Sequence, residues 1–203
     1  MARPRATADF WFDPLCPWAW MTSRWLKEVE RVRDVTPSFH VMSLGYLNAD
    51  PDIPDDEQER PVERWGPVRV CLAAAHAHGD DVLDQLYTEL GTRFHNQGRP
   101  GNKETIEQAL TAAGLAKNLA DVMESRDYDD AVIASHRHAM DLVGLDVGTP
   151  VISVQGVAFF GPVVTPIPRG EGAGKLWDGV LLAASTDGFD ELKRSRTAEP
   201  TFN

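Results

Sequence analysis

The sequence predicts an α/β fold in which a small mixed β-sheet is built in two halves around a large helical segment. Three observations lead to this prediction. An aromatic strand pattern opens the chain, only helical patterns occur between about residues 62 and 144, and strand patterns return after residue 149. The 203 residues, 42% hydrophobic and 25% charged, suffice for one domain with an insertion or for two small domains.

The first half is a strand–helix–strand pattern. Residues 8–13 are short, apolar and aromatic, which is typical of a buried strand. Residues 17–33 place apolar side chains at helical spacing, and Pro17 suits a first helical turn, where its missing N–H costs nothing. Proline 37 ends this segment, and residues 38–44 alternate as a strand. Two strands joined by a crossover helix are expected to be parallel.

The middle of the chain predicts helices alone. Residues 49–61 are acidic and proline-rich, which indicates an exposed loop. Helical patterns then follow at residues 67–78, 80–95, 103–113, 115–125 and 128–143.

The second half predicts a hairpin and a last helix. Strand patterns at residues 149–154 and 157–160 flank the dipeptide Gln155-Gly156, a plausible two-residue turn, and a helix is expected at 172–185. This order is the thioredoxin arrangement with a helical insertion. We therefore expect a thioredoxin-like domain from residues 1–50 and 145–203, and an all-helical insertion domain from residues 51–144.

Charge and composition exclude several classes of function. The net charge of −11 argues against nucleic-acid binding, which needs clustered lysine and arginine. The first eight residues lack the apolar core of a signal peptide, and no apolar stretch approaches about 18 residues, so neither secretion nor membrane insertion is expected. Two cysteines exclude a secreted disulfide scaffold and favour a reducing cytoplasm.

Cys16 is the first candidate for chemistry. It lies where the aromatic strand passes into a helix, and unpaired N–H groups at a helix start stabilise a thiolate. A buried structural cysteine is the alternative, because cysteine is among the most often buried residues. The Cys16-Pro17 pair at a strand-to-helix junction favours the functional interpretation.

Thr149-Pro150 is the second candidate. Proline is tolerated only at strand starts or edges, so this proline is either a plain strand start or the cis proline that faces the reactive cysteine in thioredoxin-like folds. The presence of Cys16 in the other half of the sheet favours the cis form.

Other candidates are weaker. Cys71 lies in an alanine-rich helical pattern and is expected in the core, and Trp18 is expected to be partly exposed beside the thiol. The histidine pairs 76/78 and 136/138 are two residues apart, so neither pair points to one side of a helix and no metal site is expected. His95 ends a helical pattern, where a solvated terminus and a substrate-facing edge both remain open.

Several segments together resemble a known family, the actinobacterial mycothiol-dependent nitroreductases of the DsbA-like branch of the thioredoxin superfamily. The branch also contains kappa-class glutathione transferases and hydroxychromene-carboxylate isomerases. The matching segments run from residue 8 to about residue 202. They are Phe-Trp-Phe-Asp-Pro-Leu-Cys-Pro-Trp at 10–18, Phe-His-Val-Met-Ser-Leu at 39–44, Arg-Trp-Gly-Pro-Val-Arg-Val at 64–70, His-Asn-Gln-Gly at 95–98, Val-Gly-Thr-Pro at 147–150, Gly-Val-Ala-Phe-Phe-Gly-Pro at 156–162 and Ile-Pro-Arg-Gly at 167–170.

The resemblance implies a cytoplasmic, dimeric, thiol-dependent oxidoreductase that reduces certain nitroaromatic compounds. Mycothiol is the implied low-molecular-weight thiol and mycoredoxin an implied partner, with no metal, nucleotide or flavin. Carried over by position, Cys16 matches the nucleophile and Trp18 the intervening tryptophan. Thr149 and Pro150 match the cis-proline loop, and a last pair, Asn48 and His95, matches positions near the ligand pocket.

Ala19 departs from the family, because it occupies the position of the second, resolving cysteine. Cys16 alone can form a mixed disulfide but cannot close an internal one. The unaltered flanking residues favour an engineered alanine, and a natural monothiol enzyme is the alternative. Three hypotheses follow: a two-cysteine reductase scaffold stopped at the mixed disulfide, a thiol transferase or isomerase, and a non-catalytic binding module.

Overall fold

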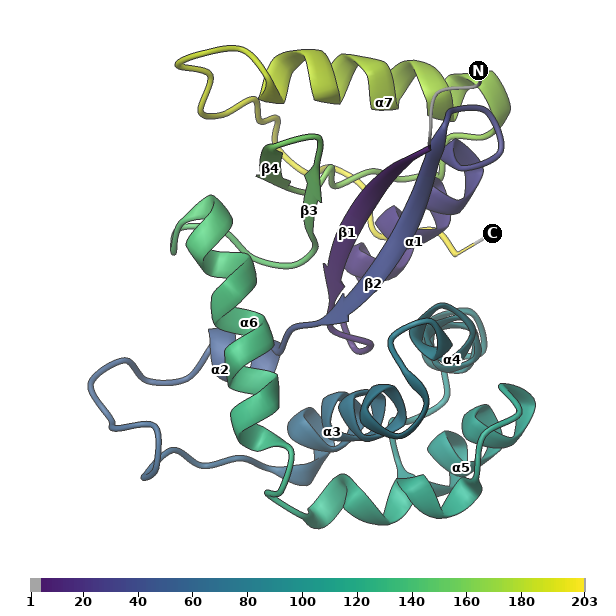
Figure 1. The fold of residues 1–203 in the computed structure, drawn as a ribbon, viewed down its shortest axis with the longest axis vertical. Helices are drawn as coiled ribbons and strands as arrows, with labels where there is room; N and C mark the ends of the chain where they lie inside the picture. The colour runs from purple at the N-terminus through teal and green to yellow at the C-terminus, as the bar shows by residue number, and fades with distance from the viewer. Residues whose placement is uncertain (1–4, 203) are drawn as a thin grey trace.

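The computed structural model describes residues 5–202 (Figure 1). The prediction that the chain has no signal peptide rests partly on residues 1–4, which lie outside the described residues. Within that range one sheet has the order β2-β1-β3-β4, with β1 at Ala6–Phe12, β2 at Val35–Val41, β3 at Val151–Val154 and β4 at Val157–Phe160. β1 pairs with β2 in parallel, as predicted, and the pairs β1–β3 and β3–β4 are antiparallel.

The first crossover helix, α1, spans Pro17–Val29 and begins at the predicted position. The prediction that a strand starts only after proline 37 was wrong, because β2 begins at Val35 and contains Pro37, which lies opposite Ala8. β2 is an edge strand. An edge strand tolerates proline because the missing N–H can face away from the ladder.

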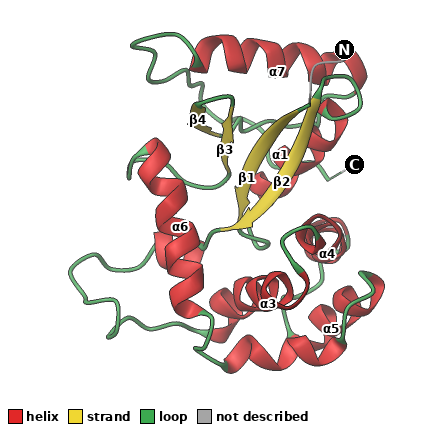
Figure 2. Cartoon of the chain, in the orientation of Figure 1, coloured by secondary structure: helices red, strands yellow, loops and turns green. Residues whose placement is uncertain are grey.

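Helical segments connect β2 to β3 (Figure 2). They are α2 at Leu44–Leu47, α3 at Val62–His78, α4 at Val82–Gly91, the π-helical turn η1 at Thr92–Asn96, α5 at Lys103–Ala112, the 3₁₀ segment η2 at Lys117–Glu124 and α6 at Asp129–Val143. The single helix predicted at residues 80–95 therefore divides at Gly91. A Cβ atom at Gly91 would lie 2.2 Å from the indole of Trp20, so α4 approaches α1 here as only glycine allows.

The second half closes the sheet as the sequence predicted. Gln155 and Gly156 have φ angles of 53° and 85°, the left-handed pair that a two-residue hairpin turn requires. The last helix, α7, spans Gly170–Ala184 and packs against α1 on the same side of the sheet (Figure 1), with the rings of Trp25 and Trp177 5.8 Å apart.

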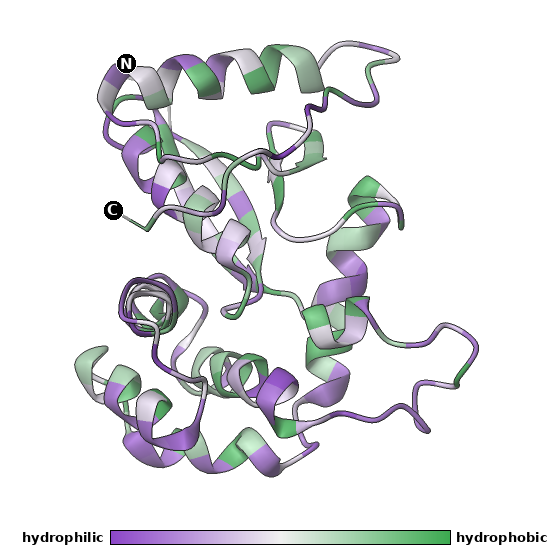
Figure 3. Ribbon diagram, turned by 180° about the vertical axis from the view of Figure 1, so that it is seen from behind, coloured by the Kyte–Doolittle hydropathy of each residue, from purple (hydrophilic) through white to green (hydrophobic). Residues whose placement is uncertain are grey.

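One apolar cluster runs from the sheet into the connecting helices, since it joins Phe10 and Trp25 to Val68, Leu86 and Ile106. The loop between α2 and α3 is mostly hydrophilic (Figure 3), as its acidic composition predicted. The division into a thioredoxin-like domain and an insertion domain at residues 50/51 and 144/145 stays a prediction, because the core is shared across it.

Candidate active site

Cys16 caps the N-terminus of α1. Its backbone is extended, and its Sγ atom accepts a hydrogen bond from the backbone N–H of Ala19 at 3.4 Å. The side chain is 5% exposed. The thiol therefore occupies the position that the sequence predicted, where the first N–H groups of a helix lack partners within the helix.

Thr149 and Pro150 lie against this thiol although 133 residues separate Thr149 from Cys16. The Thr149-Pro150 peptide bond is cis, and the Cys16 thiol donates to the carbonyl oxygen of Thr149 at 3.8 Å. The hydroxyl of Thr149 is buried and has no hydrogen-bond partner within residues 5–202. The antiparallel pairing of β1 with β3 brings these two segments together.

Ala19 is fully buried directly behind the thiol. Residues three apart at a helix start are neighbours, and a disulfide needs two Cα atoms within about 4.4–6.8 Å. A cysteine at position 19 would accordingly lie within reach of Cys16. With alanine at this position, the backbone N–H of residue 19 still contacts the Cys16 sulfur, but the side chain offers no second sulfur.

The protonation of Cys16 differs from the expectation of a stabilised thiolate. Burial raises the pKa of the thiol to about 11, against the smaller lowering effects of the N–H of Ala19 and of the Arg196 guanidinium. The nearby Asp13 carboxylate raises it further. Desolvation outweighs the helix terminus in this arrangement, so Cys16 is a protonated thiol at neutral pH.

Asp13 is a buried carboxyl group that the sequence analysis did not single out. One of its oxygens accepts the N–H of Leu15 at 2.8 Å and the other accepts the N–H of Leu44 at 2.7 Å. Burial raises the pKa of Asp13 to about 6 despite these two hydrogen bonds. The sequence held one signal for this group, namely an acidic residue at the end of an aromatic strand pattern, between Phe12 and Pro14. Asp13 holds the loop before Cys16 against the start of α2.

His95 belongs to the same assembly and is half-buried. Its Nε2–H donates to the carbonyl oxygen of Pro14 at 2.9 Å, and the neighbouring Asn96 accepts a hydrogen bond from the indole N–H of Trp20 at 3.1 Å. Burial lowers the pKa of His95, so its ring is neutral. This helix end therefore contacts the Cys16 loop and α1, and its facing a substrate stays a prediction.

The remaining predicted residues differ in how closely they are connected to Cys16. Trp18 is half-buried beside Cys16, as expected. Asn48 lies at the end of α2, where its Nδ2 donates to the carbonyl oxygen of Leu44 at 2.8 Å, and it is connected to the site through Leu44 and Asp13. Cys71 is completely buried on α3, which confirms the core interpretation, and burial raises its pKa well above the usual range.

The histidines and acidic residues of the described range do not gather at one place to hold a metal ion. Residues 5–202 contain no group of three or more histidine, cysteine or acidic side chains placed to hold a metal ion. His136 instead accepts the backbone N–H of Ser43 through Nδ1 at 3.3 Å. Within the described part of the chain, no helix has the length and apolar character to cross a bilayer.

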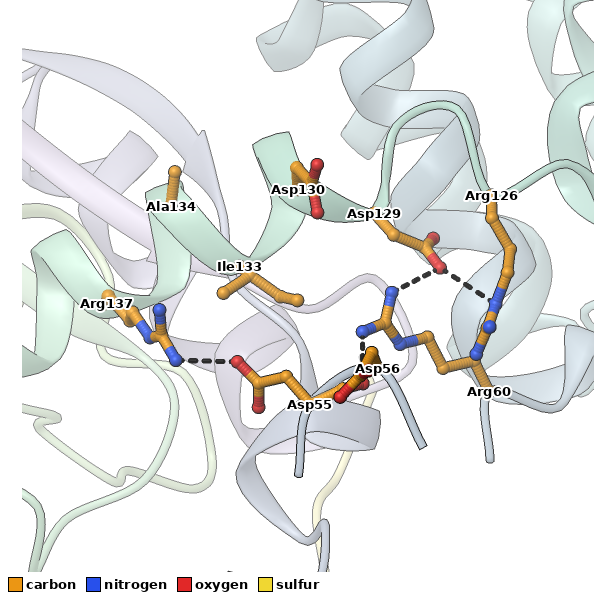
Figure 4. A pocket seen from close by; sticks show the side chains of 9 residues that line it. All are labelled: Asp55, Asp56, Arg60, Arg126, Asp129, Asp130, Ile133, Ala134 and Arg137. Atoms are coloured by element: carbon orange, nitrogen blue, oxygen red, sulfur yellow. Dashed lines mark hydrogen bonds and ion pairs between the residues drawn. The ribbon is translucent and has the colours of Figure 1, made fainter. Parts of the chain in front are cut away.

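A cavity of about 480 Å³ lies apart from Cys16, between α6 and the loop that precedes α3 (Figure 4). Several of the charged side chains that line it form ion pairs. Asp129 accepts hydrogen bonds from Arg60 and Arg69, and Asp55 pairs with Arg137 at 2.7 Å. These ion pairs neutralise the guanidinium groups and hold the loop against α6.

This chain is similar to known proteins both in sequence and in fold. A curated relative, the uncharacterized protein Rv2286c of Mycobacterium tuberculosis, is 28% identical over 198 residues, covering 94% of this chain and 83% of that protein.

Two solved structures are similar in fold. The probable DsbA oxidoreductase SCO1869 of Streptomyces coelicolor aligns at 13% identity with a TM-score of 0.61, covering 95% of this chain and 94% of that one. The cytosolic disulfide reductase DsbM of Pseudomonas aeruginosa, solved with GSH, aligns at 15% identity with a TM-score of 0.59, covering 87% and 99%. The predicted thioredoxin fold of DsbA-like type is thereby confirmed.

The sequence also matches one family from the residue before Cys16 to beyond α7. The matched family, described as Rv2466c-like, mycothiol-dependent nitroreductase Rv2466c, covers residues 15–194. This chain therefore belongs to the Rv2466c-like family of mycothiol-dependent nitroreductases.

Proposed function

We propose that this chain is the scaffold of a cytoplasmic thiol-disulfide oxidoreductase that uses mycothiol as its low-molecular-weight thiol and mycoredoxin as a reducing partner. In its two-cysteine form it would reduce nitroaromatic compounds. Family membership supports the reaction class. The observation that carries the proposal is the Cys16 thiol, which caps α1 through the N–H of Ala19 and faces the carbonyl of Thr149.

The first half of the proposed cycle needs Cys16 alone. The Cys16 thiolate attacks one sulfur of a disulfide, a new S–S bond forms, and the other sulfur leaves as a thiolate that takes up a proton. With cysteine at position 19, a second thiolate would attack the Cys16 sulfur and release the first thiol. Those steps pass the two electrons of the dithiol to the attacked disulfide. When a nitroaromatic compound is the oxidant instead, oxidation of the dithiol to the internal disulfide supplies the two electrons and two protons that convert a nitro group to a nitroso group and water, and two thiols from solution then reduce that internal disulfide.

Ala19 stops the cycle after its first half. No sulfur at position 19 can attack the mixed disulfide, and the other cysteine, Cys71, is completely buried with a raised pKa. Release of the bound thiol from Cys16 then requires a second molecule of thiol from solution. We expect this chain to accumulate the Cys16 mixed disulfide whether the alanine is engineered or natural.

The remaining roles follow from position. Pro17 and Trp18 form the loop beside the thiol, with Thr149 and Pro150 opposite. His95 positions that loop through Pro14, and Asn48 is a more remote ligand-side residue. We further propose a homodimer, with no metal, nucleotide or flavin in the reaction.

The test compares the present chain with Ala19→Cys, each with and without Cys16→Ser. Mycothiol-dependent loss of a nitroaromatic chromophore is expected only for Ala19→Cys with Cys16 intact. Intact-mass spectrometry after treatment with mycothiol disulfide is expected to show one mycothiol on Cys16 in the present chain. If Ala19→Cys gains no nitro reduction, the reductase proposal is wrong.

A kappa-class-like thiol transferase or isomerase is the second candidate, and one observation favours it: Cys16 contacts the N–H of residue 19 and needs no second thiol to do so. Steady-state turnover of an electrophilic substrate by the present chain, lost in Cys16→Ser, would support it. A single stoichiometric adduct without turnover would favour the reductase.

A further inference from the structure

Residues 196–202 fold back over the candidate active site. In Figure 1 this yellow segment crosses α1 and ends near α4. The guanidinium of Arg196 lies 5.3 Å from the centre of the Trp18 ring. The ring of Phe202 lies 5.5 Å from that of His95, tilted by 34°, and its carbonyl oxygen accepts a hydrogen bond from Asn96 Nδ2 at 2.7 Å.

These contacts fall on both sides of the reactive cysteine. Trp18 follows Cys16 by two residues, and His95 holds the carbonyl of Pro14, which precedes it by two. A further contact, from the N–H of Thr201 to the hydroxyl of Thr165 at 3.1 Å, fixes the segment between them. The segment thus bridges α1 and η1 across the loop that carries the thiol.

We propose that residues 196–202 form an autoinhibitory strap, in which Phe202 takes the place of a planar aromatic substrate. Strap closure and substrate binding then exclude one another. The inference rests on the proposed function for the identity of the substrate, but the strap itself rests on the contacts alone.

The chemistry of the Phe202 position indicates the class of ligand. The position offers the face of a neutral imidazole from His95 and an amide donor from Asn96. A planar ring satisfies the first and an acceptor oxygen satisfies the second. Phe202 supplies a ring and its own carbonyl oxygen, and a nitroaromatic compound supplies a ring and nitro oxygens.

The strap is held weakly enough to be displaced. Residues 191–199 and 201 are exposed, so the segment contributes little apolar burial. One tilted ring contact, one cation–π contact and two hydrogen bonds, less the entropy of ordering the segment, favour closure by roughly tenfold. Cys16 is 5% exposed in this closed arrangement, so its thiol is shielded from reagents in solution.

The first test measures how fast iodoacetamide alkylates Cys16, followed by intact mass, with circular dichroism as the check of folding. A truncation that removes residues 195–203 is expected to react about tenfold faster than the present chain, and Phe202→Ala to fall between them. Lys193→Ala, in the same segment but outside the strap, is the matched control and should match the parent. A folded truncation and a folded Phe202→Ala that both react at the parent rate would overturn the strap.

The second test asks whether an aromatic ligand displaces the strap. Hydrogen exchange of peptides covering residues 190–203 is measured with and without 4-nitrobenzyl alcohol, with α6 peptides as the internal reference. Faster exchange in the strap alone is the expected result. Unchanged exchange at saturating ligand would overturn the inference that substrate displaces Phe202. Neither readout uses redox turnover, so failure of the Ala19→Cys assay would leave the strap result standing.

Discussion

The imidazole of His95 and the carbonyl of Pro14 are joined by a 2.9 Å hydrogen bond across 81 residues of sequence. His95 belongs to η1, and Pro14 belongs to the loop that leads to Cys16. The helical segment thereby positions the loop that carries the thiol, and does so with a neutral ring, because burial lowers the pKa of His95.

Removal of the His95 ring should loosen this loop. We expect His95→Ala to accelerate alkylation of Cys16 several-fold, because the Pro14 carbonyl loses its donor and Phe202 loses the ring that it contacts. His95→Gln is the matched variant, since its amide can still donate to Pro14 but offers no ring to Phe202. Its alkylation rate should lie between those of the present chain and of His95→Ala. Alkylation rates measured at pH 7 and pH 9 check this, and equal rates for alanine and glutamine would contradict a role for the hydrogen bond.

The close approach of α4 to α1 should make Gly91 intolerant of a side chain. A Cβ atom there would lie 2.2 Å from Trp20, so Gly91→Ala is expected to lower the free energy of unfolding by about 1–3 kcal/mol. Gly179→Ala in α7 has nothing within 4 Å of its new Cβ and should raise that energy by up to about 1 kcal/mol. Urea denaturation of both variants measures the difference, and a neutral Gly91→Ala would show that the helices separate freely.

Two buried titratable groups should give opposite slopes in the pH dependence of stability. Asp13 keeps its proton to about pH 6 when folded but loses it near 3.8 when unfolded, so stability falls as pH rises through that interval. His136 binds its proton near 6.5 when unfolded but only at about pH 4 when folded, because burial and the neighbouring Arg137 lower its pKa. Stability therefore rises with pH over its interval, and the two effects nearly cancel between pH 4 and 6.

Single substitutions should separate these slopes. In Asp13→Asn the His136 effect remains, so the free energy of unfolding should rise by up to about 1.4 kcal/mol per pH unit between pH 4 and 6. In His136→Asn, whose amide oxygen can still accept the N–H of Ser43, that free energy should fall with pH over the same range. Urea titrations at half-unit pH steps measure both, and parallel profiles for the two variants would refute the assignment.

The buried ion pairs of Asp129 should be essential to the helical segment. Asp129 and Arg69 are each 2% exposed and bonded at 2.7 Å, and although burial of Asp129 opposes ionisation, hydrogen bonds from Arg69 and Arg60 lower its pKa overall. Asp129→Ala leaves Arg69 buried without its partner and should cost about 3–5 kcal/mol of stability. Asp121→Ala breaks the exposed pair with Lys103 and should cost at most about 1 kcal/mol. Thermal and urea unfolding distinguish them, and equal losses would contradict the role of burial.

The local pattern of the sequence was sufficient for the strand-to-helix junction at Cys16 and for the Gln155-Gly156 turn. Both depend on neighbours in sequence, namely Pro17 at a first helical turn and a left-handed pair between two short strands. Pro37 misled the strand assignment, because whether a strand tolerates proline depends on its place at the sheet edge. The close approach at Gly91 was equally hidden, since it depends on the indole of Trp20 from another helix.

The sequence by itself determined the order of elements, the candidate thiol and the absence of a second sulfur at position 19, because all three are properties of local pattern and residue identity. Only the tertiary structure decided the state of that thiol. Burial raises the pKa of Cys16, Asp13 lies beside it, and His95 and residues 196–202 converge on its loop from distant parts of the chain. Desolvation and contacts of this kind depend on which segments fold together, and no local pattern encodes them.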